Sequence, residues 1–274
     1  MDATPVLLRS AGPWRFHDPA AKLLARGALP GAFGYDLAAH SLRCARATGL
    51  PLIELLPAAL PTSWMVNNRA PSPVFRRWLT PPLLGVWSAL LDQLTGDTPG
   101  DPMEVRYTLE ALCIEGHGLA AVSKVLALLV PEVVPLLDDA AVWLLTGSVS
   151  RPETADEPAA GPEHFLPSLA VFERSVQASE PALIALARGY TLAPLDAAQV
   201  LDRLTWFDSW GWRHGAASHE RAGWAWLADA EREGVVRVPA GGPARVPTAR
   251  LDLASVPADH WTAEARQALD TAST

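Results

Sequence analysis

Two glycines around a histidine, followed by paired carboxylates, form the pattern in this sequence that is most able to do chemistry. Gly116, His117 and Gly118 stand between two stretches with helical spacing, and Asp138 and Asp139 follow a loop broken by prolines. Glycine permits a tight turn with positive φ. A helix that begins after such a turn has free backbone N–H groups that can face a phosphate. The first interpretation is therefore a helix-hairpin-helix that binds a phosphate backbone.

A dinucleotide-binding fingerprint is the competing interpretation of the same residues. Gly116, Gly118 and Ala121 satisfy G-x-G-x-x-G/A, and an acid about twenty residues further on stands where a ribose-binding carboxylate would lie. Against it, residues 103–114 have helical rather than strand spacing, and Pro135 would interrupt a central parallel strand. No alternation of strands and helices follows. We therefore favour the helix-hairpin-helix.

The segment Glu110–Val142 resembles the helix-hairpin-helix DNA glycosylase superfamily, in particular bacterial proteins with an 8-oxoguanine DNA glycosylase-like fold. The likeness lies in the G-x-G turn, the run Ser-Lys-Val-Leu at 123–126, a proline loop and the run VPLLDD at 134–139. A weaker likeness covers residues 200–212. The resemblance implies a two-lobed, mainly α fold and a DNA-repair hydrolase that acts on a flipped base. It also implies that the hairpin binds DNA and that Asp138 is the catalytic carboxylate.

The sequence departs from that superfamily at one reactive position. Its bifunctional members carry a lysine nucleophile two residues after the second glycine, where this chain has Ala120. The departure predicts a monofunctional enzyme. Lys124 lies one helical turn later on the same face, so it is a second candidate catalytic residue, although a solvated surface lysine is the simpler interpretation. Asp138 and Asp139 can equally cap a helix that begins near Ala140.

An aromatic run at 206–212 supplies the candidate walls of a base pocket. Trp210, Trp212 and His214 belong to it or follow it, and aromatic side chains stack on unpaired bases. The alternative is core packing, because Trp206 and Trp210 stand four residues apart, at helical spacing.

The first eighty residues hold the best basic cluster. Asn68, Arg69, Arg76 and Arg77 lie around a proline loop, where such side chains can fill the gap left by a flipped base or read its partner. A polar turn is the alternative. His117 likewise has two interpretations, as a donor to phosphate and as an ordinary turn residue.

Net charge argues against a strong nucleic-acid binder. The chain carries a formal charge of −8 and has a sequence pI near 5.3. Residues 1–80 hold nine Lys/Arg and four Asp/Glu, whereas residues 81–160, which contain the hairpin, hold three and twelve. Phosphate contacts need positive surroundings. Two cysteines cannot build a disulfide framework or a zinc site by themselves.

Apolar residues at three- and four-residue spacing predict a mainly α protein. The expected helices cover 20–26, 37–48, 83–94, 103–114, 119–130, 165–178, 180–189, 196–206, 219–233 and 262–270, and a small β-hairpin is expected at 235–252. The acidic, proline-rich segment 151–163 predicts a linker between a helical lobe at 1–150 and a tryptophan-rich lobe at 164–274.

These observations together predict a monofunctional DNA glycosylase-like protein that acts on duplex DNA without metal or cofactor. The alternatives are a nucleic-acid or protein-binding module on the same scaffold and an enzyme that processes free nucleosides. No apolar stretch is long enough for a membrane span. The start of the sequence lacks the pattern of a signal peptide, so we expect a cytoplasmic protein with no membrane partner.

Overall fold

The computed structural model describes residues 4–27, 29–63, 75–96, 100–114, 117–147, 160–190 and 193–214. Within these ranges the protein is mainly helical, with ten α-helices and one two-stranded sheet, which confirms the predicted class. The C-terminal β-hairpin and the helices expected beyond residue 218 lie outside the described residues.

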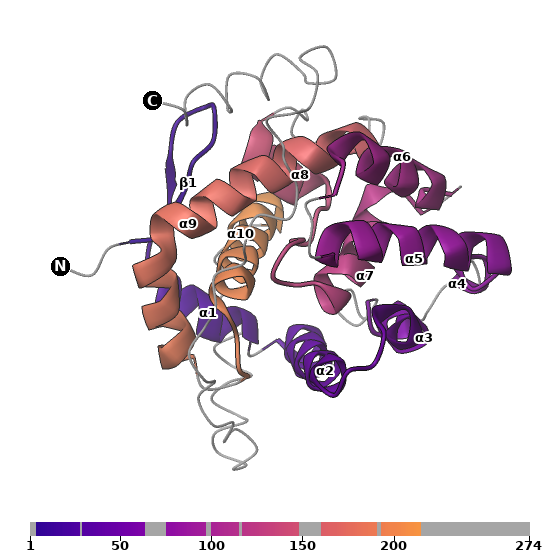
Figure 1. Cartoon of the computed structure of the whole chain (residues 1–274). Coiled ribbons are helices and arrows are strands. Elements are labelled where there is room, and N and C mark those ends of the chain that lie inside the picture. The colour runs from indigo at the N-terminus through magenta and orange to yellow at the C-terminus, as the bar shows by residue number, and fades with distance from the viewer. Residues whose placement is uncertain are drawn as a thin grey trace.

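The elements follow one another in the order that Figure 1 shows. They are β1 (Val6–Leu7), β2 (Trp14–Arg15), α1 (Pro19–Gly27), α2 (Pro30–Ala47), α3 (Leu52–Thr62), α4 (Phe75–Trp78), α5 (Pro81–Thr95), α6 (Pro102–Leu112), α7 (Leu119–Leu129), α8 (Asp139–Thr146), a 3₁₀ turn at Pro162–His164, α9 (Phe165–Gly189) and α10 (Ala197–His214).

The sequence marks several helix starts chemically. Pro81 and Pro102 stand in the first turns of α5 and α6, where proline loses no intrahelical hydrogen bond. Asp101 caps α6 by accepting from the Met103 N–H, and Asp196 caps α10 by accepting from the Gln199 N–H, both at 2.8 Å.

Prolines make two helices differ from their prediction. Residues 165–189 form one helix, α9, and not two, because Pro181 lies on its exposed side, where water can satisfy the freed carbonyl. Helix α3 contains Pro57 and was not predicted. Its buried face, which includes Leu56 and Leu60, supplies the packing that outweighs the lost hydrogen bond.

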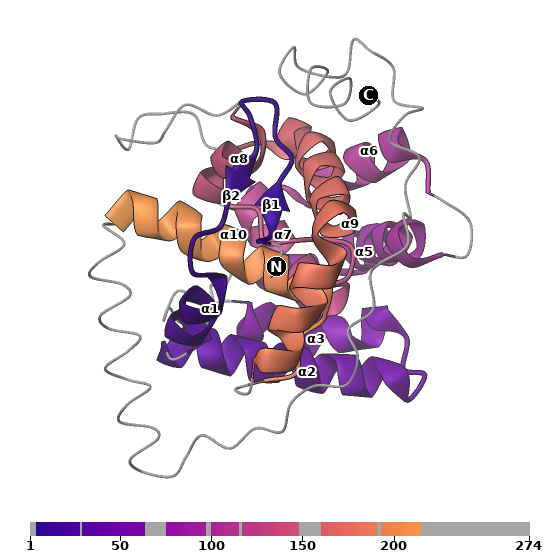
Figure 2. The ribbon, with the colours of Figure 1, turned by 90° about the vertical axis from the view of Figure 1, so that its left-hand side faces the viewer.

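A short N-terminal hairpin packs on the long helix α9. Strand β1 pairs antiparallel with β2, with Leu7 opposite Trp14. The N–H groups of Val6 and Leu8 donate to the hydroxyls of Ser179 and Ser175 on α9, at 2.9 and 2.8 Å. Figure 2 shows this hairpin beside α9. These side-chain acceptors hold strands that were too short to predict.

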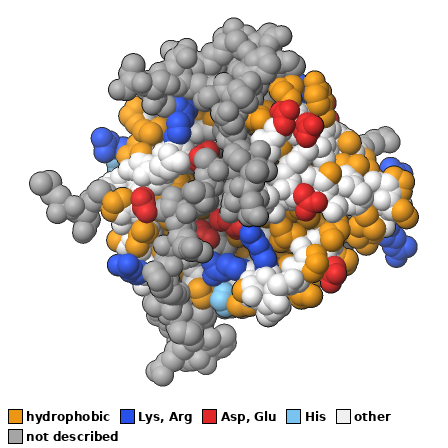
Figure 3. Space-filling view, viewed as in Figure 1, with side chains coloured by type: hydrophobic (Ala, Val, Ile, Leu, Met, Phe, Trp, Pro, Cys, Tyr) orange, Lys and Arg blue, Asp and Glu red, His pale blue; other side chains and the backbone are white. Residues whose placement is uncertain are grey.

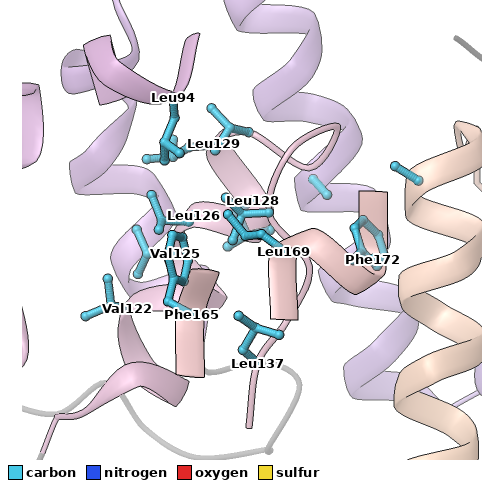
Figure 4. Close-up of a cluster of buried hydrophobic side chains, with 14 of the residues drawn as sticks. Leu94, Val122, Val125, Leu126, Leu128, Leu129, Leu137, Phe165, Leu169 and Phe172 are labelled. Carbon is cyan, nitrogen blue, oxygen red and sulfur yellow. The ribbon is translucent and has the colours of Figure 1, made fainter. Parts of the chain in front are cut away.

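Helix α7 is embedded in the core. Its side chains Val122, Val125 and Leu126 belong to one buried cluster with Phe165 and Leu169 of α9 (Figure 4). Helices α8 and α1, which precede the expected linker, pack against α9 and α10, which follow it. The core therefore draws on helices from both sides of residues 151–163.

None of the helices in the ranges given above is long and apolar enough to cross a membrane. Among those same residues, no group of three or more His, Cys, Asp and Glu side chains is placed to hold a metal ion.

Candidate nucleic-acid interface and catalytic carboxylate

The hairpin region joins two helices through a tight turn. Helix α6 ends at Leu112, the His117 N–H donates to the Ile114 carbonyl at 2.8 Å, and Gly118 is the N-cap of α7. A helix therefore occupies 102–112, where a dinucleotide-binding fold would have a strand. The backbone of Gly118 has φ −84°, and a Cβ there would meet no atom within 4 Å. Gly118 is exposed and is not required for a left-handed conformation, contrary to the sequence-based expectation.

His117 points into an aromatic cluster and not toward solvent. It is 6% exposed, and its ring centroid lies 5.8 Å from that of Phe75 and 5.6 Å from that of Trp78, both edge-on. The Trp78 indole N–H donates to the Leu112 carbonyl at 2.9 Å. The predicted contact between the His117 imidazole and a phosphate would require this side chain to leave its packing site, and the His117 backbone N–H is already bonded to the Ile114 carbonyl.

The same aromatic cluster places two predicted basic residues near the hairpin. Arg76 and Arg77 lie between Phe75 and Trp78 on α4, and both are exposed. Figure 3 shows basic side chains at the right-hand edge of the face that it draws. In the same view, Figure 1 places α4, α5 and α6 at this edge. The basic residues of those helices are Arg76, Arg77 and Arg106. Arg106 pairs with Glu110 on α6 at 2.9 Å, so the α4 pair is the part of this edge suited to phosphate.

Asp138 is the N-cap of α8. Its Oδ1 accepts from the Ala141 N–H at 2.9 Å, and its side chain is half-buried. The neighbouring Asp139 instead accepts from the Ala160 N–H at 2.8 Å. The predicted capping role is confirmed for Asp138. Capping uses one oxygen and fixes the direction of the carboxylate, so it is compatible with a catalytic role.

The loop before Asp138 runs back along α7. Leu136 belongs to a small buried cluster with Ala127, while the Leu137 N–H donates to the Ser123 hydroxyl at 2.9 Å. The loop therefore runs from the end of α7 at Leu129 back to the level of Ser123. Asp138 follows in extended conformation, one residue after this contact with α7.

Lys124 lies on the face of α7 that is only partly buried, together with Ala120 and Ala121. Its carbonyl accepts from the Tyr35 hydroxyl of α2 at 3.2 Å. Lys124 thus shares a face with Ala120, as its spacing predicted.

Cys113, at the start of the hairpin, is a free, partly buried cysteine. Burial, reinforced by the negative charges of Glu110 and Glu163, raises the pKa of its thiol to about 11. The thiol therefore stays protonated, and the thiolate is the reactive form of cysteine.

Sequence reasoning missed a buried charge network behind the loop. Asp36 of α2 accepts from Arg26 of α1 at 2.7 Å and from Arg203 of α10 at 2.9 Å. Arg203 also pairs with Asp202, whose other oxygen accepts from the Leu136 N–H at 2.8 Å. All four charged side chains are at most 5% exposed. The network therefore connects three helices to the loop that carries Asp138.

The remaining predicted site residues cannot be placed against this site. Gly116, Asn68 and Arg69 lie outside the described residues. Trp210, Trp212 and His214 lie in the last turns of α10, but only their backbone is described. Trp206, one turn before Trp210, is buried beside Leu136, with the Arg26 guanidinium 5.2 Å from its ring centre.

No protein-family profile matches this sequence, and neither a curated protein nor a solved structure matches it. The function is therefore inferred from the residues and their placement.

Proposed function

We propose that this chain is a monofunctional, DNA glycosylase-like hydrolase that cleaves the N-glycosidic bond of a flipped nucleotide, with Asp138 as its carboxylate. The observation that carries the proposal is the position of Asp138. It directly follows Leu137, whose N–H is bonded to Ser123 in the first half of the helix after the hairpin, and its Oδ1 is fixed by the Ala141 N–H.

The chemistry needs a carboxylate at this place. Cleavage of an N-glycosidic bond develops positive charge on the sugar, and a fixed anion close to it stabilises that charge or activates the attacking water. The first turn of α7, directly after the hairpin, would hold the DNA backbone through its N–H groups, with the flipped nucleotide beside Asp138. The alanine at 120 supports hydrolysis without a covalent Schiff-base intermediate.

Duplex contact rests on the positive charge of α4. Arg76 and Arg77 are exposed beside the hairpin because their neighbours Phe75 and Trp78 pack on His117. Two arginines offset part of the acidic surroundings, so we expect binding that weakens steeply with salt. The finer fold proposed with this function is the two-lobed glycosylase architecture with a C-terminal hairpin.

The net charge of −8 supports a second candidate, an enzyme that acts on free nucleosides. Such an enzyme would use the same carboxylate and needs no contact with a polyanion. A binding module without catalysis is the third candidate, and the experiment below separates it from the two enzymes.

Base release from a panel of duplex oligonucleotides with damaged or modified bases tests the proposal. The wild type should release a base from at least one duplex, and Asp138→Asn should abolish release. Asparagine also caps helices well, so this variant removes the charge and keeps α8. Release from nucleosides alone would support the second candidate, whereas no release from either substrate class would contradict both enzymatic functions.

A further inference from the structure

We infer that Ser123 and Asp202 are positioning residues that form a two-point clamp on the loop before Asp138 and thereby set the place of its carboxylate. The inference rests on the proposed function of Asp138. It goes beyond that function because it assigns roles to two buried side chains that touch no substrate.

Ser123 is bonded to the residue before Asp138. Its hydroxyl accepts from the Leu137 N–H at 2.9 Å, and its one hydrogen has two acceptors at 3.3 Å, the Ala120 carbonyl of its own helix and the Leu137 carbonyl. The Leu137 carbonyl belongs to the peptide unit that leads directly into Asp138. Ser123 is fully buried, so no water is at hand to replace it at these two groups.

Asp202 holds the preceding peptide unit from the opposite side. Its Oδ1 accepts from the Leu136 N–H at 2.8 Å, across 66 residues of sequence. Asp202 is itself fixed by Arg203, which Asp36 holds in turn. The successive peptide N–H groups of Leu136 and Leu137 are therefore fixed by two side chains from different helices, α10 and α7.

This arrangement matters because the loop, although its apolar side chains are buried, has few other hydrogen bonds. Pro131 and Pro135 have no N–H to donate, and the N–H groups of Val133 and Val134 bond only to Val130, at the start of the loop. The last residues before Asp138 thus depend on side chains for their hydrogen bonds. A displacement of about 1 Å at a reacting group is enough to lower a rate by about a hundredfold.

Ser123→Ala is the decisive variant. We expect single-turnover base release to fall by about tenfold to a hundredfold, while the dissociation constant for the duplex stays within about twofold, because Ser123 contacts no DNA. Amide hydrogen exchange of Leu137 should accelerate, while the core amides of α7 keep their protection. A purely structural role would lower the folded fraction but not the rate per folded molecule.

Ser168→Ala is the matched control. Ser168 is equally buried on α9, and its hydroxyl has no hydrogen-bond partner among the described residues, so its loss should change neither rate nor affinity. Ser123→Cys keeps the volume but hydrogen-bonds weakly, and we expect it to resemble Ser123→Ala. Asp202→Asn keeps an acceptor for the Leu136 N–H and should retain more rate than Asp202→Ala.

A full rate in Ser123→Ala, or a rate restored by Ser123→Cys, would overturn the clamp while the wild type still releases base. Equal losses of rate and duplex affinity would overturn it as well. If the wild type itself releases no base, both the proposed function and the clamp are contradicted. Failure of the clamp alone is distinguishable from this result, because the wild type then still releases base.

Discussion

Removal of the Asp36 carboxylate should be among the most destabilising single changes in this protein. Asp36 is fully buried and accepts from Arg26 at 2.7 Å, from Arg203 at 2.9 Å and from the Tyr190 hydroxyl at 3.3 Å. In Asp36→Ala, two buried guanidinium groups share one remaining anion, Asp202. Loss of one partner from a buried ion pair costs about 3–5 kcal/mol, which is a large part of the roughly 5–15 kcal/mol that is typical of a folded domain.

Urea unfolding followed by tryptophan fluorescence measures this loss, and Trp206 reports on the network because the Arg26 guanidinium lies 5.2 Å from its ring centre. Glu110→Ala is the comparison, because it breaks the exposed pair with Arg106 on α6 and should cost only about 0.3–0.5 kcal/mol. Asp36→Asn keeps an acceptor and should lie between the two. A loss below about 1 kcal/mol in Asp36→Ala, or one equal to that of Glu110→Ala, would refute the idea that this network holds the three helices together.

Three further predictions concern Asp196, the arginine pair of α4 and the cap of α8. Burial raises the pKa of Asp196 from 3.8 to about 6, so the native state binds more protons than the unfolded state between about pH 4 and 6. This contribution to stability is lost as pH rises through that window. The urea midpoint of Asp196→Asn should lack this pH dependence, and equal pH dependence of the wild-type and variant midpoints would contradict the assignment. The double variant Arg76→Ala, Arg77→Ala should weaken duplex binding without a change in urea midpoint. The slope of log affinity against log salt concentration should fall by about one for each phosphate that is no longer neutralised. An unchanged slope would show that α4 does not contact the duplex. Asp138→Ala should lower the free energy of unfolding by about 1 kcal/mol through loss of the α8 cap, and Asp138→Asn by only a few tenths. Equal losses in the two variants would show that the Asp138 side chain does not stabilise the protein by capping α8.

Local sequence pattern was sufficient for most helices but not for the elements that depend on distant partners. Helices α5, α6 and α7 show apolar spacing at three and four residues and were predicted within a few residues. Helix α3 was missed because Pro57 is a local signal against a helix, whereas the burial of Leu56 and Leu60 that stabilises it is a tertiary effect. The N-terminal hairpin depends on hydroxyl groups of α9 more than 160 residues away.

In the candidate site too, local sequence predicted some features, whereas others depend on residues that are distant in sequence. The N-cap role of Asp138 follows from its residue type and position, and the structure confirms it. The burial of His117 depends on Phe75 and Trp78, some forty residues earlier in the sequence. Asp202 gave no local signal, since nothing near it in sequence indicates that it binds the Leu136 N–H.

The most direct test of the central claim compares two neighbouring carboxylates in one single-turnover assay. Asp138→Asn and Asp139→Asn each remove one negative charge at the start of α8, but the Asp139 side chain accepts from the Ala160 N–H, whereas Asp138 ends the loop that returns to α7. We expect that the wild type and Asp139→Asn release base from the same modified duplex at similar rates, and that Asp138→Asn releases none. Wild-type release that survives in Asp138→Asn would contradict the assignment of Asp138 as the catalytic carboxylate.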